Sequence, residues 1–409
     1  MQRKNTKILN DPLYGFINLP GELIPIIDHP YFQRLRRIRQ LGMTNLVYPG
    51  ANHSRFHHAL GAMHLMKQAI DTLRNKGISI TYNEEIAAQA AILLHDIGHG
   101  PFSHALEDSI VKGIHHEELS LLFMNELNKH FNEQLHDAIA IFKGTYPKKF
   151  LHSLVSSQLD MDRLDYLNRD SFFTGVSEGI ISSERIIKML DLRKDELVIE
   201  AKGIYSIEKF IVSRRLMYWQ VYLHKTVVSA ENMLINILKR AKELVRSGKQ
   251  IFCTPALKIF LATDYTITSF RDDDSLLPNF ALLDDSDITT GVKVWANDSD
   301  PILSQLCTRM FTRRLFKLSM SNEPFAQEEI IETKQKIKSF FKINDNDLHY
   351  YFIAGKLSNH AYSPSDDQIN IVTKQNEIID IADATDNLSL KALSRPVEKY
   401  YICFPKEII

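Results

Sequence analysis

A long apolar segment that ends in adjacent histidine and aspartate residues constrains this chain more than any other feature. Residues 84–95 read EEIAAQAAILLH, a strong helix former that becomes almost wholly apolar, so we expect a helix buried in the core. His95 and Asp96 end this segment, and a turn rich in glycine and histidine follows. Such a pair at the end of a helix can hold a divalent cation in a cleft. The alternative is that His95 and Asp96 merely cap the helix.

Two other segments supply further candidate metal ligands. His58 lies upstream in HSRFHHALG, and Asp162 lies downstream in SQLDMDRLDYLNRD. With His95 and Asp96 they make a set of two neutral and two anionic ligands. This set suits a divalent Fe, Mn, Ni, Co or Zn ion, with positions left open for water or phosphate. We expect one such ion per chain, and Mg accompanying a nucleotide is a further option.

The composition is that of an ordinary globular protein. Of the 409 residues, 44% are hydrophobic and 24% are charged, and the formal net charge is −1. A charge this close to zero provides no global basic field to attract nucleic acid. No apolar run is long enough to span a membrane. Cys253, Cys307 and Cys403 lie far apart and are expected to be free thiols in a reducing compartment, so we expect a cytoplasmic protein.

The patterning predicts a mainly α protein with two parts. Residues 1–250 are expected to form a helical core, and residues 207–246 within it to form one or two long helices. Residues 251–409 are expected to form a smaller α+β lobe, because β-branched and aromatic residues cluster there as in strands. We expect this lobe to serve in oligomerisation or regulation. The expected strands lie in LHYYFIAGKL, QINIVTK, EIIDIAD and KYYICFP, and a short hairpin is expected in DELVIEAKGIYSI.

These segments resemble the HD-domain phosphohydrolase superfamily, and more closely its deoxynucleoside triphosphate triphosphohydrolase branch. The resemblance covers roughly residues 1–240 and extends in patches to residue 317. It implies a helical HD-domain core with a metal held by His58, His95, Asp96 and Asp162. The matching blocks are KILNDPLYG, IIDHPYFQRLRRIRQLG, VYPGANHSRFHHALG, LLHDIGHGPFSHALE, HHEELS and LDMDRLDYLNRD.

The resemblance implies catalytic roles for His104 and His116, with Glu107 supporting His116. Glu107 stands where some relatives carry aspartate, so the supporting arm is longer here. A histidine held near a carboxylate can give a proton near neutral pH. Two alternatives remain open: these are ordinary loop histidines, or they are ligands of a second metal ion, as in some HD phosphodiesterases.

The same blocks imply a set of substrate-binding residues. Arg55 is expected to share a helical face with His58 and to reach a phosphate at the metal. Tyr166 is expected to pack near the sugar, and Asp170 to accept a hydrogen bond from its 3′-hydroxyl. A wall that includes Leu41 would exclude a 2′-hydroxyl, although simple core packing of Leu41 and Tyr166 is the alternative. The full set is Gln40, Leu41, Arg55, His99, Arg163, Tyr166 and Asp170.

A second nucleotide site is also implied, between subunits of a homo-oligomer that would be a tetramer or a dimer. Its residues fall in blocks resembling the guanine-nucleotide activator site of the family. Asp28 could accept from guanine, while lysine and arginine hold the phosphates. The alternative is a solvated basic helix face with ordinary packing. The residues are Lys7, Ile8, Asp28, Gln33, Arg36, Arg313 and Lys317.

The sequence therefore predicts an enzyme that hydrolyses deoxynucleoside triphosphates to deoxynucleoside and inorganic triphosphate. The first alternative is another HD phosphohydrolase activity, as a nucleotidase or a cyclic-nucleotide phosphodiesterase. The second is a nucleic-acid-binding protein with a vestigial site, which basic clusters such as RLRRIR would favour and the near-neutral charge opposes.

Overall fold

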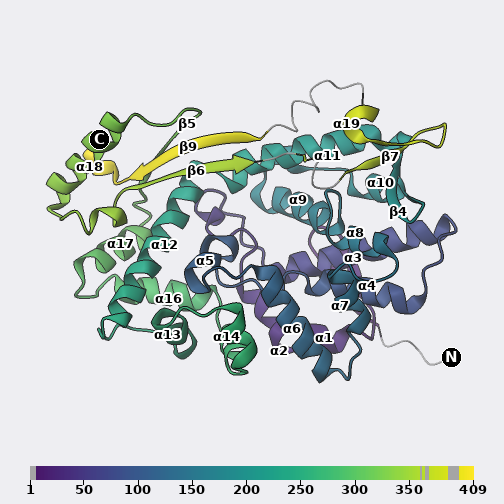
Figure 1. Ribbon diagram of the computed structural model, residues 1–409, viewed down its shortest axis with the longest axis horizontal. Coiled ribbons are helices and arrows are strands. Elements are labelled where there is room, and N and C mark those ends of the chain that lie inside the picture. Colours follow the sequence, from purple (N-terminus) through teal and green to yellow (C-terminus); the bar gives the residue numbers. More distant parts are fainter. Residues whose placement is uncertain (1–5, 360–361, 364–367, 386–395) are drawn as a thin grey trace.

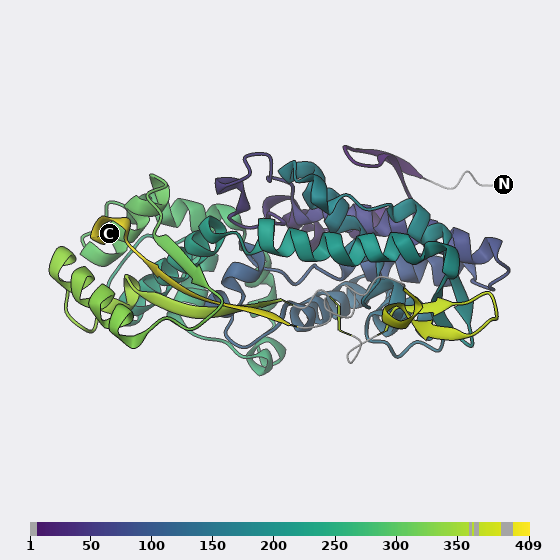
Figure 2. The same ribbon diagram turned by 90° about the horizontal axis from the view of Figure 1, so that it is seen from above.

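The structure is a computed structural model that describes residues 6–359, 362–363, 368–385 and 396–409. It is an elongated molecule, with a helical body at one end and a mixed helical and sheet lobe at the other (Figures 1 and 2). The expectation of a mainly helical protein with small sheets towards the C-terminus is confirmed. None of the helices in the described part of the chain has both the length and the apolar content needed to cross a bilayer.

The centre of the helical body is formed by α3 (Arg55–Asn75), which packs against α4 (Tyr82–Leu94) and α9 (Met161–Thr174). The expected apolar helix is α4, and every residue from Ala87 to Leu94 in it is buried. Thr81 starts this helix through a capping box with Glu84. Further helices are α1 (Ile24–Asp28), α2 (Pro30–Gln33), α5 (Glu107–Ile110), α6 (His116–His130), α7 (His136–Phe142), α8 (Lys149–Val155) and α10 (Ser183–Lys188).

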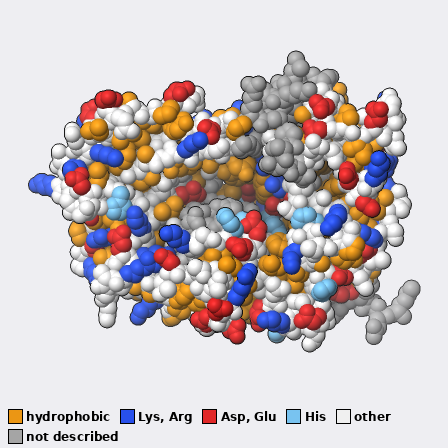
Figure 3. All heavy atoms as spheres, viewed as in Figure 1, with side chains coloured by type: hydrophobic (Ala, Val, Ile, Leu, Met, Phe, Trp, Pro, Cys, Tyr) orange, Lys and Arg blue, Asp and Glu red, His pale blue; other side chains and the backbone are white. Residues whose placement is uncertain are grey.

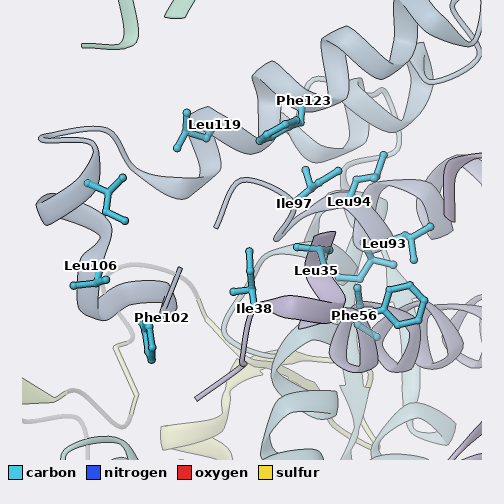
Figure 4. Close-up of a cluster of buried hydrophobic side chains, with 14 of the residues drawn as sticks. Leu35, Ile38, Phe56, Leu93, Leu94, Ile97, Phe102, Leu106, Leu119 and Phe123 are labelled. Atoms are coloured by element: carbon cyan, nitrogen blue, oxygen red, sulfur yellow. The ribbon is translucent and has the colours of Figure 1, made fainter. Parts of the chain in front are cut away.

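The end of α4 packs in a cluster of buried hydrophobic side chains from segments far apart in the sequence (Figure 4). Leu93 and Leu94 of α4 and the following Ile97 are fully buried there. Phe56 from α3 and Phe123 from α6 belong to the same buried core. Burial of each such side chain contributes about 1.5–3 kcal/mol. The residues that follow α4 are therefore held on a rigid base.

Residues 207–246, expected to form one or two long helices, belong to two helices separated by a break. Helix α11 (Ile204–Met217) runs into a π-helical turn, η6 (Tyr218–Tyr222), and α12 (Lys225–Arg246) follows. Single π turns are rare and occur frequently at functional sites. This break therefore marks a region to compare with the candidate ligands.

The C-terminal lobe surrounds α12, which contacts α13, α17 and β5. Its sheet is antiparallel, with the strand order β5 (Lys317–Ser321), β9 (Val397–Phe404), β6 (Ile353–Asn359). The strands expected in LHYYFIAGKL and KYYICFP are β6 and β9. The helices are α13 (Pro255–Ala262), α14 (Ile267–Asp272), α15 (Leu276–Ala281), α16 (Asp285–Trp295), α17 (Pro301–Phe311) and α18 (Gln327–Phe341).

A second sheet joins the middle of the chain to its C-terminal part, in the order β3-β4-β7-β8. Its strands are β3 (Leu190–Arg193), β4 (Glu196–Glu200), β7 (Asn370–Val372) and β8 (Ile378–Asp380), and α19 (Ile381–Ala384) follows. β4 pairs in parallel with β7, so the late strands return to the helical body. The predicted domain boundary at about residue 250 stays a prediction. After forming the C-terminal lobe, the chain returns to the helical body as β7 and β8.

Candidate metal centre and active-site cleft

Ends of three helices place the predicted metal ligands. His58 lies in the first turn of α3, His95 and Asp96 directly follow α4, and Asp162 lies in the first turn of α9. Asp160 starts α9, because its side chain accepts a hydrogen bond from the Arg163 backbone N–H at 2.7 Å. Since α3 contacts both α4 and α9, these helix ends meet on one side of the body.

The donor atoms of His58, His95 and Asp162 converge on one point, and Asp96 lies beside them. Nε2 of His58 lies 3.0 Å from Oδ1 of Asp162 and 3.4 Å from Nε2 of His95. Asp96 lies 3.4 Å from His95 Nε2 through Oδ1 and 3.7 Å from His58 Nε2 through Oδ2. Two donors that are each about 2.1 Å from a metal ion lie about 3.0–3.4 Å apart at octahedral or tetrahedral angles. His58, His95 and Asp162 therefore fit around one metal ion, and Asp96 adjoins them through its contact with His95.

The charges of the group favour a bound cation. Burial alone would lower the pKa of His58, but hydrogen bonds to Asp162 and Asp165 raise it to about 10. Burial alone would raise the pKa of Asp162, but the two histidines lower it far below its usual value. The carboxylates thus stay ionised, and their excess negative charge attracts either protons or a divalent ion. Two imidazoles and two carboxylates suit a borderline transition metal.

A second group of potential ligands adjoins the first. The side chains of Asp96, His99 and His116 offer ligand atoms within 4.8 Å of one another. His99 and His116 stack, with ring centroids 3.8 Å apart and an interplanar angle of 17°. Burial and the nearby Arg55 lower the pKa of His99 well below its usual value, which keeps this ring neutral. Asp96 also lies 3.4 Å from His95 of the first group, so the alternative of a second metal ion stays open.

A cavity of about 300 Å³ opens beside the metal ligands. All seven of the predicted substrate-binding residues line it, together with Asp96, Asp162 and His116. In the space-filling view, one face of the molecule is hollowed at its centre, with histidine side chains nearby (Figure 3). The lining residues are Gln40, Leu41, Arg55, Asp96, His99, His116, Asp162, Arg163, Tyr166, Asp170, Tyr218 and Tyr222.

Some polar groups on the cavity wall already have hydrogen-bond partners within the protein, and others do not. Arg55 is buried and donates to Ser103 Oγ at 2.7 Å and to the Asp96 carboxylate. The Asp160 carboxylate pairs with Arg163, which raises the pKa of that guanidinium despite its burial. Among the described residues, Gln40 Oε1 and Arg163 Nε are buried and lack a hydrogen-bond partner. Such groups are costly unless a ligand or water satisfies them.

The expected sugar contact, Asp170, is held by two residues that the sequence analysis missed. Tyr222 donates its hydroxyl to Oδ2 of Asp170 at 2.7 Å, and His53 Nε2 lies 2.7 Å from Oδ1. His53 is buried and stacks on Phe173. Tyr222 reaches the cavity from the π turn η6, whose other end carries Tyr218. The break in the long helical pattern at residues 218–224 could have pointed to Tyr222, but it gives no signal for His53.

Two of the predicted catalytic side chains lie outside the described residues. His104 and Glu107 belong to segments whose backbone is described, in a 3-10 turn (Ser103–Leu106) and in α5. Their roles therefore stay predictions. His116 is described and lies at the cavity, as the first residue of α6.

The predicted activator residues form separate groups in one chain. Lys7 pairs with Asp28 at 3.1 Å, and Arg36 donates to Gln33 at 2.8 Å. These residues and the exposed Ile8 belong to the first elements of the chain. Arg313, which donates to the Leu46 carbonyl, and Lys317, at the start of β5, belong to the C-terminal lobe.

Comparison with known proteins gives the family. Residues 55–170 match the HD domain, and residues 181–252 match the HD associated region. A phosphohydrolase from Bacteroides thetaiotaomicron of known structure is 54% identical, with a TM-score of 0.94 over 98% of this chain and 100% of that one. The uncharacterized protein YwfO of Bacillus subtilis is 33% identical, over 98% of this chain and 93% of its own length.

More distant relatives carry names for an activity. The deoxynucleoside triphosphate triphosphohydrolase SAMHD1 of Homo sapiens is 29% identical, and the match covers 58% of this chain and 45% of that protein. The Dictyostelium discoideum homologue is 31% identical, over 61% of this chain and 52% of its own length. Together, the matched HD domain, the full-length relatives and the converging His and Asp ligands show that this chain belongs to the HD-domain phosphohydrolases.

Proposed function

We propose that the protein hydrolyses deoxynucleoside triphosphates to a deoxynucleoside and inorganic triphosphate. The observation that carries this proposal is the cavity itself. One continuous wall combines metal ligands, two arginines and an acceptor carboxylate at Asp170. A nucleoside triphosphate needs these three kinds of group, for its phosphates and its sugar. The names of the human and Dictyostelium relatives support the same substrate class, although the chain spans only about half of their lengths.

The residues of the cavity have distinct roles in this reaction. A divalent ion held by His58, His95, Asp96 and Asp162 would polarise a phosphoryl oxygen and lower the pKa of water. Arg163 would neutralise charge that gathers on the phosphates as water attacks the α-phosphorus. The bond between this phosphorus and the 5′-oxygen then breaks. The 5′-oxygen takes up a proton and leaves as the deoxynucleoside, and the attacking water oxygen stays in the triphosphate.

His116 is the described group best placed to move that proton. It lines the cavity, and its ring stacks on His99, which borders the metal ligand Asp96. Histidine transfers protons near neutral pH, and a general acid typically contributes about 100- to 10,000-fold to a rate. His104 and Glu107 complete this proposal from the resemblance alone.

The sugar side of the cavity supports a preference for deoxynucleotides. Asp170 is oriented by Tyr222 and His53 to accept from a 3′-hydroxyl, and Gln40 offers a buried acceptor without a partner among the described residues. Leu41 and Tyr166 give the same wall an apolar surface. A 2′-hydroxyl pressed against such a surface would lose its hydrogen bonds to water.

The test is turnover of each deoxynucleoside and nucleoside triphosphate, with the products identified in ¹⁸O-labelled water. The proposal predicts deoxynucleoside and triphosphate, with the label in the triphosphate, and faster turnover of dATP than of ATP. Release of pyrophosphate or of single phosphates would contradict the proposed reaction. Equal turnover of ATP and dATP would contradict the sugar selection.

The group of Asp96, His99 and His116 favours one alternative, an HD phosphodiesterase or nucleotidase with two metal ions. Such an enzyme would use His99 and His116 as ligands, so each loss would lower the metal content. Hydrolysis of cyclic nucleotides or nucleoside monophosphates, with two metal ions per chain, would favour this alternative over the main proposal.

We also propose regulation by a guanine nucleotide bound between subunits. The two groups of predicted activator residues come from the first 40 residues and from the C-terminal lobe, and the resemblance implies that a neighbouring copy brings them together. GTP or dGTP should then stimulate hydrolysis of another deoxynucleotide and favour a tetramer. Arg36→Ala should abolish the stimulation and leave the metal in place. Rates and assembly that ignore guanine nucleotides would contradict this regulation.

A further inference from the structure

The side of His58 that faces away from the metal ligands is held by a buried carboxylate. Its Nδ1 lies 2.8 Å from Oδ2 of Asp165, which is on the next turn of α9 after Asp162. Both side chains are fully buried. A metal-ligating histidine commonly gives its second ring N–H to such a carboxylate, which fixes the ring and its tautomer. Asp165 therefore holds the His58 ring with Nε2 aimed at the ligand group.

Asp165 is itself held by a buried arginine that reaches the N-terminal hairpin. Arg169 donates to Asp165 from Nε at 2.9 Å and from Nη2 at 3.0 Å. Its Nη1 donates to Asp11 at 2.9 Å. Asp11 ends β1 (Lys7–Asp11), and it also accepts from the backbone of Leu13 and Tyr14 in the turn before β2 (Gly15–Leu19).

Charge and space are both matched along this series. Burying Arg169 is costly unless both Asp11 and Asp165 pair with it. Loss of any one of these three charges would therefore take a partner from another buried charge. Gly61 of α3, one turn after His58, provides the room. A Cβ at Gly61 would overlap Asp165 Oδ1 and Arg169 Nη2, far inside van der Waals contact. A larger residue there would displace the carboxylate that holds His58.

We propose that Asp165 is a positioning residue for the metal centre, and that Arg169 and Asp11 make the N-terminal hairpin part of the same device. The series runs from the hairpin through α9 to His58, so a change in the hairpin alters how firmly the metal is held. This inference rests on the metal centre and not on the identity of the nucleotide substrate.

The test is the affinity for Mn²⁺ alone, measured by competition with a fluorescent chelator. Asp165→Asn, Asp11→Asn and Gly61→Ala should each bind Mn²⁺ more weakly, by roughly 10- to 100-fold for Asp165→Asn. Asp11→Asn keeps an acceptor for the turn and removes only the charge that faces Arg169. Gly61→Ala should favour the helix by about 1 kcal/mol, so weaker binding there would reflect the displaced carboxylate.

The matched control is Glu85→Gln, which weakens another ion pair of the helical body, between Glu85 of α4 and Arg74 of α3. It should lower stability and leave the affinity for Mn²⁺ unchanged. Affinities of Asp11→Asn and Gly61→Ala that equal this control would overturn the proposal, even if Asp165→Asn fails to fold. A wild-type protein that binds no Mn²⁺ would instead refute the metal centre itself.

Discussion

The two groups of histidine and aspartate in the cleft are built in different ways. His58, His95 and Asp162 come from the ends of long packed helices, and buried ion pairs support them from behind. His99 and His116 flank the segment between α4 and α6 instead. In that segment Phe102 and Ser103 have φ values of 54°, which is uncommon for residues other than glycine. The metal centre is thus preformed, whereas the neighbouring group depends on a strained segment.

The C-terminal lobe holds this strained segment in place. Asp285, at the start of α16, accepts from the Phe102 backbone N–H at 2.8 Å and from that of Arg39 at 3.1 Å. Backbone strain of this kind costs about 1–3 kcal/mol per residue and persists only where surrounding contacts impose it. The comparison teaches that the cation site is a property of the helical body, while the side of the cleft that carries His99 and His116 needs both lobes.

The largest expected effect comes from removing a metal ligand. Asp162→Ala should lower turnover by more than about 1,000-fold, because it removes the anionic metal ligand that lies beside both His58 and His95. A steady-state assay over a range of Mn²⁺ concentrations measures this loss. Recovery of wild-type turnover at high Mn²⁺ would show that Asp162 is a dispensable ligand.

A smaller loss is expected in the second group. His116→Ala should lower turnover by about 100- to 10,000-fold while the metal is kept, because a proton donor is lost and not a ligand. His115→Ala is the matched control, since the adjacent ring is exposed and caps α6. Near-wild-type turnover of His116→Ala would return His116 to the class of ordinary loop histidines.

The sugar side should respond more weakly. Tyr222→Phe removes one hydrogen bond to Asp170, so kcat/KM for dATP should fall about 5- to 10-fold, which corresponds to about 1 kcal/mol. Tyr48→Phe is the control, because the Tyr48 hydroxyl bonds the same π turn at the Gln220 carbonyl and not Asp170. Equal kcat/KM values in the two variants would remove Tyr222 from the sugar site.

The smallest effect on activity is expected at Asp285, where stability changes with pH. Burial raises the pKa of Asp285 to about 6, against the hydrogen bonds from Phe102 and Arg39, which lower it. The unfolded chain therefore loses this proton at a lower pH than the fold does, and stability falls as pH rises from about 4 to about 6. Asp285→Asn loses one of the two accepted hydrogen bonds at every pH, so its effect lies in the pH dependence: the stability of the wild type relative to this variant should fall by roughly 1–3 kcal/mol between pH 4 and pH 7.

Urea unfolding at pH 4, 5.5 and 7 measures this difference. A stability difference between Asp285→Asn and the wild type that does not change with pH would show that folding leaves the pKa of Asp285 unchanged.

The sequence predicted those parts of the molecule that depend on local pattern. The apolar run before His95 is helix α4, and the predicted metal ligands lie together because each ends or starts a helix. The hairpin near residue 200 was only partly predicted. It lies at residues 190–200, because Lys194 and Asp195 adopt positive φ without glycine, and residues 204–207 begin α11 instead.

Features that depend on distant segments were not predictable in the same way. The Asp165–Arg169 pair has helical spacing, but its link to Asp11 joins residues 158 positions apart. Tyr222 and His53 meet Asp170 only after three segments fold together. The return of β7 to β4 likewise has no local signal in the sequence.

Metal analysis of the purified wild-type protein, His95→Ala and His116→Ala tests the central claim most directly. The preformed centre predicts about one divalent ion per chain in the wild type, almost none in His95→Ala, and an unchanged amount in His116→Ala. Full metal content in His95→Ala, or loss of metal in His116→Ala, would contradict the division between a metal-binding group and a proton-transferring group.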